Sequence, residues 1–285
     1  MTTTLTRFLP GSDGAAGVRL WLKASGYARR LLAGAGDPWE TPAGFLSFFA
    51  QAQGLLRPDV AVIEVGDLYR SWTARHPGLV ADMVSRRRAS VPLRKMLDDP
   101  GPRKVLAEVV EAVIGHMRGR APVVLAFPAP RAWLAEALAI AGCSGLAIDD
   151  DAVEDAAMYM ADLLRAVSAF PIAGILLEEE PGTVLDATAL AACRPLLNVA
   201  EHYRWGVVLR AELADGLPAA ALAPFDAVIG PAPVAGFAGA TGQDVSAALW
   251  AGAAVPEPAA GAFRFAEVPV MATPELVLER LDLIR

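Results

Sequence analysis

Short apolar runs alternate with segments of helical spacing over the C-terminal two-thirds of this chain, and this alternation restricts its fold more than any other feature. The apolar runs end in charged residues, glycine or proline, as buried parallel strands do. They lie at 122–127, 172–177, 206–209 and 225–230, with a shorter strand or connector at 145–148. The segments with apolar residues at helical spacing lie at 105–117, 133–140, 153–170, 190–203 and 274–284. Alternating strands and helices predict a mostly parallel sheet covered by helices.

The chain length bears on which parallel fold this is. The chain has 285 residues, and a (β/α)8 barrel commonly has about 250. Together with weaker strand candidates, the pattern predicts an α/β fold of the (β/α)8 TIM-barrel type, irregular at its N-terminal end; a doubly wound sheet is the alternative. We predict one domain over 1–285. Within it, residues 1–44 form an N-terminal extension, and the Gly/Ala/Pro-rich span 230–261 forms a long loop over the barrel mouth.

Composition narrows the class of protein. Apolar residues make up 54% of the chain, yet no apolar run reaches the roughly 20 residues that span a bilayer without a charge or proline. With no signal-peptide pattern at the N-terminus, we expect a cytoplasmic protein without a membrane partner. The net charge of -7 argues against a nucleic-acid partner. Two cysteines, three histidines and no C-x-x-C or H-E-x-x-H motif predict no metal site, and we expect no cofactor.

Charged residues follow three of the expected strands. In the segment 59–68, an apolar run is followed by Glu64 and Asp67. The strand at 172–177 is followed by Glu178, and the strand at 206–209 is followed by Arg210 and Glu212. The C-terminal ends of strands in a parallel barrel meet on one face, so these side chains are candidates for one shared pocket. The alternative for the first pair is a strand that ends in a solvated turn.

Two arginines are candidates for binding an anion. Arg210 and Glu212 are two positions apart and therefore lie on the same side of their strand. They pair with each other, or the guanidinium holds a substrate carboxylate through two hydrogen bonds. Arg131 follows the strand at 122–127 and is a second anion contact, unless it is a surface residue at the start of a helix.

The order of these segments resembles the uroporphyrinogen decarboxylase family, whose superfamily includes cobalamin-independent methionine synthases and corrinoid or coenzyme M methyltransferases. Residues 56–68 look like the family's "G-x-D-A-A-I-x-F-S-D-I" strand, with Asp67 at its catalytic aspartate, and 121–133 is similar to "P-V-I-G-F-x-G-G-P-W-T-L-A". The strand to Glu178 matches "G-A-D-A-I-Q-I-x-D", and the final helix resembles "P-P-E-N-V". The likeness covers roughly residues 45 to 285, and implies a (β/α)8 barrel, often dimeric, with its pocket at the strand C-termini.

The chain also departs from this family. The decarboxylases have an "M-R-Q-A-G-R" segment that grips porphyrin carboxylates, and nothing like it stands near 39–43. Their late "G-H-G" is missing before Pro274. Residues 206–212 fall where the family has "V-P-V-I-L-H-x-C-G", and the methyltransferases use this His-x-Cys to hold zinc. Arg210 and Glu212 occupy those two positions, so neither porphyrin decarboxylation nor zinc-dependent methyl transfer is expected.

These observations predict a metal-independent lyase or decarboxylase that acts by acid/base catalysis on a small, carboxylate-bearing metabolite. One alternative is a zinc-free methyltransferase that uses folate or another donor. The other is a catalytically silent barrel that binds a ligand or a partner chain. A homodimer is expected from the resemblance. The predicted catalytic residues are Asp67 and Glu178, and the predicted substrate contacts are Glu64, Arg131, Arg210 and Glu212.

Overall fold

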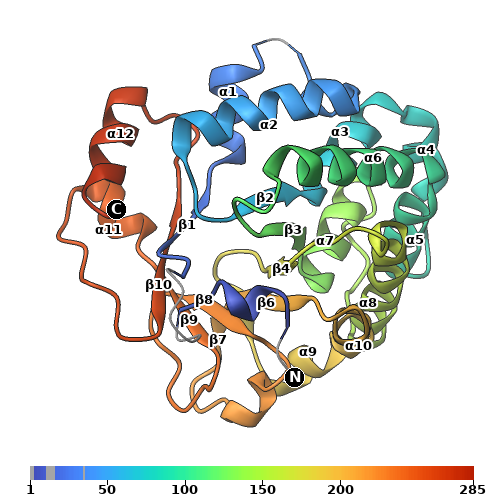
Figure 1. Cartoon of the computed structure of the whole chain (residues 1–285). Helices are drawn as coiled ribbons and strands as arrows, with labels where there is room; N and C mark the ends of the chain where they lie inside the picture. Colours follow the sequence, from blue (N-terminus) through green and yellow to red (C-terminus); the bar gives the residue numbers. More distant parts are fainter. Residues whose placement is uncertain (1–2, 11–16, 35) are drawn as a thin grey trace.

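Eight parallel strands form a nearly closed barrel with helices around its outside in the computed structural model, which describes residues 3–10, 17–34 and 36–285 (Figure 1). Neighbouring strands follow the order β1-β10-β9-β8-β6-β4-β3-β2. The predicted (β/α)8 TIM-type barrel is confirmed. Its strands are β1 (Leu20–Lys23), β2 (Ala61–Glu64), β3 (Val123–Pro128), β4 (Gly174–Glu178), β6 (Gly206–Arg210), β8 (Ala227–Gly230), β9 (Ala240–Asp244) and β10 (Ala262–Glu267).

Proline and capping side chains start many of the surrounding helices. Asp99 begins α6 by accepting the N–H of Gly101, and Asp149 begins α8 by accepting the N–H of Ala152. The predicted helix at 190–203 is two helices, α9 and α10, which meet at Cys193. The helices are α1 (Ser25–Leu32), α2 (Pro42–Leu56), α3 (Val65–Arg75), α4 (Pro77–Met83), α5 (Ser90–Asp98), α6 (Pro100–Met117), α7 (Pro130–Ile140), α8 (Asp150–Leu164), α9 (Ala187–Ala192), α10 (Arg194–Tyr203), α11 (Ser246–Ala251) and α12 (Pro274–Asp282).

Two segments differ from their predicted roles. Residues 1–44 are not an extension, because they contain β1, which pairs with β10, and helix α1. Residues 230–261 are not one long loop, because they contain β9 and α11. The sequence of β9, Ala-Thr-Gly-Gln-Asp, lacks an apolar run. Its Gly242 faces the barrel interior, where the ring of Phe263 fills the space that a side chain would take. The strand or connector considered at 145–148 is a turn and irregular backbone.

Apolar side chains fill the barrel below its C-terminal mouth. Trp21, Val124, Leu176, Phe263 and Phe265 belong to one buried cluster inside the barrel, and Trp21 stacks on Phe263 with 5.9 Å between ring centroids. This packing closes the barrel axis, as in other small parallel barrels. Polar chemistry is therefore restricted to the layer above it.

A short 3-10 helix, Leu5–Arg7, closes the opposite end of the barrel. Leu5 is fully buried in the interior cluster and lies so close to Gly206 that a Cβ there would collide with it. Thr3 and Thr6 donate hydrogen bonds to Oδ1 of Asp226, at 3.1 and 3.0 Å. The catalytic layer of such a barrel must therefore lie at the other end.

Strands β1 and β2 lie side by side without a ladder of hydrogen bonds, and we call the gap between them the seam. Asp59 joins the two strands at the end of the seam far from the mouth. Its Oδ2 accepts the backbone N–H groups of Arg19 and Leu20, both at 2.9 Å, and its own N–H donates to the carbonyl of Leu20 at 3.4 Å. Helix α2 covers the seam from outside (Figure 1).

Asp59→Ala should destabilise the fold by about 1–3 kcal/mol, because two backbone donors lose an ionised acceptor. Chemical denaturation measures the loss, and hydrogen exchange should quicken at the amides of Arg19 and Leu20. Asp215→Ala, with no side-chain hydrogen bond among the described residues, is the control. Equal stability of both variants would show that Asp59 does not hold the seam.

In the part of the chain that is described, no helix is both long enough and apolar enough to span a membrane.

Candidate active site

Six charged side chains form a layer at the C-terminal mouth of the barrel. Each is the final residue of its strand. Each also lies an even number of positions after the apolar residues that fill the barrel, so its side chain is on the same, inward face of the strand. The pairing register aligns Glu178 with Arg210 and Lys23 with Glu267 on neighbouring strands. We call this set the charged ring: Lys23, Glu64, Glu178, Arg210, Asp244 and Glu267.

Arg210 is the centre of the charged ring. Its Nη1 lies 3.1 Å from Oε1 of Glu178 and 2.8 Å from Oε2 of Glu267, and its Nη2 lies 3.2 Å from Oδ2 of Asp244. The guanidinium also lies over the ring of Phe265, 4.4 Å from its centroid. Burial alone would lower the pKa of Arg210, but the three carboxylates raise it. This guanidinium is thus occupied by protein carboxylates.

The predicted pairing of Arg210 with Glu212 is wrong. The strand of Arg210 ends at that residue, and Glu212 begins β7 (Glu212–Leu213), which pairs with β5 (Val184–Leu185) in a separate two-stranded sheet. Glu212 is exposed and accepts the N–H of Gly182 at 3.3 Å. Side chains two positions apart share one side only within a continuous strand, and this strand is interrupted at Ala211. Glu212 therefore lies outside the charged ring.

Lys23 is a cation that the sequence analysis missed, because its strand was not recognised. Its Nζ lies 2.8 Å from Oε2 of Glu178. Burial opposes its charge, but Glu64, Glu178 and Glu267 together raise its pKa. An ammonium has three N–H donors, and among the described residues Lys23 uses one of them. Two donors remain for a ligand.

Glu64 is the most perturbed acid of the ring. Burial, followed by the negative charge of Glu178, raises its pKa to about 8, although Lys23 opposes the shift. No other described residue forms a hydrogen bond or an ion pair with its carboxyl group, so that group is available to a ligand. At neutral pH, Glu64 is therefore a protonated acid beside an ammonium.

Asp67, the predicted acid/base residue, lies next to the ring but not in it. It belongs to the first turn of α3, and its Oδ1 is 2.6 Å from Nη2 of Arg70. Nη1 of Arg70 in turn lies 2.8 Å from Glu136. The side chain of Asp67 thus holds a local ion-pair chain at the rim of the pocket.

Arg131 is also apart from the ring. Its Nη2 lies 3.4 Å from Oδ1 of the exposed Asp150, and its Nη1 donates to the carbonyl of Ile148 at 3.2 Å. Of the predicted site residues, the structure brings Glu64, Glu178 and Arg210 together. Asp67 is beside them, whereas Arg131 and Glu212 point elsewhere.

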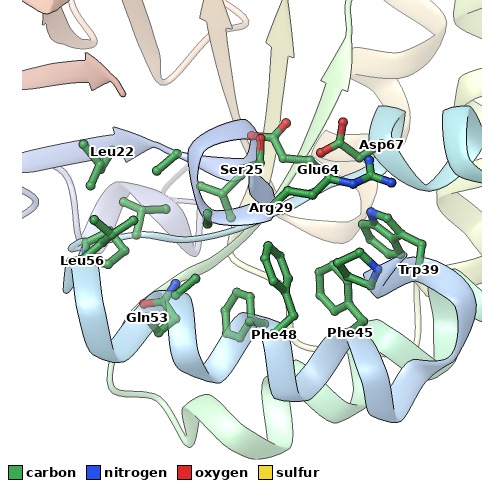
Figure 2. Close-up of a pocket in the computed structure, with 18 residues that line it drawn as sticks. Leu22, Ser25, Arg29, Trp39, Phe45, Phe48, Gln53, Leu56, Glu64 and Asp67 are labelled. Atoms are coloured by element: carbon green, nitrogen blue, oxygen red, sulfur yellow. The ribbon is translucent and has the colours of Figure 1, made fainter. Parts of the chain in front are cut away.

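An apolar pocket leads from Glu64 and Asp67 into the seam between β1 and β2 (Figure 2). It contains about 700 Å³ of empty space, part of it open to solvent. The aromatic side chains of α2 line one wall, and Leu22 with helix α1 lines the other. The apolar wall residues with the largest side chains are Leu22, Trp39, Phe45, Phe48, Phe49 and Leu56. The pocket can take an apolar group whose polar end reaches Glu64.

The described residues contain no cluster of three or more His, Cys, Asp or Glu side chains arranged to hold a metal ion. The chemistry that these residues themselves offer is proton transfer from Glu64 and charge stabilisation by Lys23. Glu64 stands at the end of the apolar pocket, and Lys23 acts on its charge from the neighbouring part of the charged ring.

Comparison with known proteins supports the fold. No protein-family model matches the chain, and no curated protein sequence matches it. A solved structure of a "methyltransferase from Methanosarcina mazei" superposes with a TM-score of 0.63 at 12% identity, over 100% of this chain and 98% of that chain. A dihydrodipicolinate synthase from Bacillus clausii gives a TM-score of only 0.35 at 12% identity, over 76% of this chain and 68% of that chain, and this low score does not indicate a shared fold. The first match places the chain among TIM barrels.

Proposed function

We propose that this barrel is a metal-independent lyase of the decarboxylase type, in which Glu64 is the general acid. The proposal rests on the position of Glu64, which ends the apolar pocket and feels the charge of the Lys23 ammonium, and on burial, which raises the pKa of Glu64 to about 8. The substrate is a small carboxylate-bearing molecule with an apolar body. Its body occupies the pocket, and a carboxylate binds the two free N–H donors of Lys23.

The reaction breaks the bond between a carboxyl group and a carbon atom of the substrate. The electron pair moves onto that carbon, stabilised by a carbonyl or conjugated ring of the substrate itself, and carbon dioxide leaves. Glu64 then delivers its proton to the carbon and becomes a carboxylate. Lys23 stabilises that charge, since it is the group that most favours the ionised form of Glu64.

The other ring residues position these two groups. Glu178 accepts hydrogen bonds from both Lys23 and Arg210, so it fixes the ammonium relative to the guanidinium. Arg210 is a positioning residue in this proposal, because its three carboxylate contacts leave it poorly placed to take a substrate anion. Lys23 has the anion-binding role that was predicted for Arg210.

Zinc-free methyl transfer and a silent binding barrel are the competing functions. The match to a methyltransferase at 12% identity supports the fold alone and does not favour methyl transfer. A silent barrel would bind carboxylates in the pocket and release them unchanged.

A panel of carboxylates tests the proposal. Purified protein is incubated from pH 6 to pH 9 with 3-oxo acids and aromatic carboxylates, and carbon dioxide is measured. We expect release whose rate falls as the pH rises through about 8, because Glu64 then loses the proton that it must donate. Lys23→Met should weaken substrate binding.

Thermal stabilisation by these acids without any product would favour the silent barrel. A rate that rises through pH 8 would contradict the role of Glu64 as an acid. Lys104→Met, on the exposed side of α6, is the matched control for the loss of a lysine.

A further inference from the structure

The seam exposes two strand edges to the pocket. The N–H of Arg264 donates to Arg19 at 2.9 Å and that of Val268 donates to Lys23 at 2.8 Å, so the odd-numbered residues of β1 direct their backbone groups at β10. Backbone directions alternate along a strand. Leu22 therefore directs its N–H and C=O groups away from β10 and into the seam.

Strand β2 also directs alternate backbone groups into the seam. The N–H of Ala61 donates to the carbonyl of Pro122 at 2.9 Å, and the parallel register continues through Ile63 and Leu125. The odd-numbered residues of β2 thus pair with β3. Val62, between them, directs its N–H and C=O groups into the seam, opposite β1.

These backbone groups have no partner among the described residues. Asp59 satisfies Leu20 at the far end of the seam, but no hydrogen bond reaches the backbone of Leu22 or Val62. Both residues line the pocket, and Leu22 is only 4% exposed. Unpaired backbone groups in such surroundings are unfavourable, so a ligand that bonds to them gains affinity.

We propose that the ligand of this pocket is a peptide-like carboxylate, whose amide N–H and C=O groups pair with the open edges of β1 and β2. An extended chain that joins a sheet edge binds in this way. The apolar side chain of the ligand lies against the aromatic wall of α2. The position of its carboxylate at Lys23 rests on the proposed function. Val62 and Glu64 are two residue steps apart along the strand, about 7 Å, and this spacing suits a ligand the size of an N-acyl amino acid or a dipeptide. To react as proposed, such a ligand must carry a carbonyl beside its carboxyl-bearing carbon, as an N-malonyl amide does.

Matched ligands test whether the amide is recognised. N-acetyl-L-phenylalanine and its ester analogue, O-acetyl-L-3-phenyllactate, differ only by an amide N–H in place of an ester oxygen. Calorimetric titration uses the Glu64→Gln protein, so that neither ligand is consumed. We expect the amide to bind about tenfold more tightly than the ester, as loss of one buried hydrogen bond implies. Equal affinities, or no binding of either, would overturn the proposal.

A proline substitution tests the protein side of the same contact. Val62→Pro removes an N–H that points into the seam and keeps the hydrogen bonds between β2 and β3, as proline does on a strand edge. It should weaken binding of N-acetyl-L-phenylalanine about tenfold, whereas Val62→Ala should change it little. Equal effects of the two variants would contradict an edge contact.

Hydrogen exchange decides the matter if Val62→Pro does not fold. In the unliganded protein, the amides of Leu22 and Val62 should exchange faster than that of Ile63, which is in the β2–β3 ladder. N-acetyl-L-phenylalanine should slow at least one of the two. If neither is slowed, the ligand does not use the strand edges.

The two proposals fail in different ways. If carbon dioxide is released from simple carboxylates while amide and ester bind equally, only the peptide-like ligand is wrong. If the amide preference holds while no acid in the panel and no N-malonyl amide releases carbon dioxide, the lyase is wrong and the binding site remains.

Discussion

Replacing Glu64 with glutamine should reduce turnover by roughly 10²- to 10⁴-fold, the usual contribution of a general acid. Glutamine keeps the size and hydrogen-bonding capacity of the protonated side chain but has no proton to give. The rate is measured at pH 7 on whichever acid of the panel releases carbon dioxide. Unchanged turnover would remove Glu64 from the mechanism.

The same substitution should stabilise the folded protein at alkaline pH. The pKa of Glu64 is raised from 4.5 to about 8. Between these values the folded state retains a proton that the unfolded chain has released, so the stability from this group decreases as the pH rises and is lost above about 8. Glutamine never ionises. It should therefore be more stable than the native side chain by about 2–4 kcal/mol at pH 9 and nearly equal to it at pH 4.

Denaturant unfolding at pH 4 and pH 9 measures this difference. Asp67→Asn is the matched control, because it also neutralises a carboxylate at the pocket rim. It breaks the contact with the half-exposed Arg70 and should change stability by about 1 kcal/mol or less. It should also leave most of the turnover. If Asp67→Asn abolishes turnover and Glu64→Gln does not, Asp67 is the acid.

Arg210→Met should destabilise the fold by about 3 kcal/mol, the second large effect we expect. Three carboxylates face this guanidinium, and its side chain is only 20% exposed. Without it, Asp244 and Glu267 lose their cation and repel Glu178 in a poorly solvated layer. Thermal unfolding should show a decrease of roughly 6–12 °C for a chain of this size.

Arg131→Met is the control, since its partner Asp150 lies 3.4 Å away on the surface, and it should have an effect below about 1 kcal/mol. Equal effects of the two substitutions would show that the charged ring does not depend on Arg210.

The barrel was predictable where its strands are buried on both faces. β3, β4 and β6 consist of continuous apolar runs, because helices cover one side and the barrel interior the other. β9 escaped recognition because it reads Ala-Thr-Gly-Gln-Asp, with a glycine where the ring of Phe263 needs space. A short strand whose small side chains fit around a neighbour leaves no apolar pattern.

The site was predictable only where its strands were. Glu64, Glu178 and Arg210 were found because they follow recognised apolar runs. Lys23 was missed together with β1, as Asp244 and Glu267 were with their strands. Asp67 was predicted to be catalytic because it matches the catalytic aspartate of the family that the sequence resembles. The two-residue period of Val60, Val62 and Glu64 indicates instead that Glu64 is the inward residue, since α3 begins at Val65 and turns Asp67 to the rim.

The missing ladder between β1 and β2 also affects the order in which the protein folds. β1 is made early, but its ladder partner is β10, so until β10 is made only the hydrogen bonds of Asp59, at the end far from the mouth, hold this strand. Pairing over such a long stretch of chain is slow, and it cannot proceed while the ribosome is still adding residues. Lys23 and Glu267 therefore enter the mouth together, in the step that completes the barrel. A nascent chain that has not reached this step has neither a closed wall nor the ammonium that its acid needs.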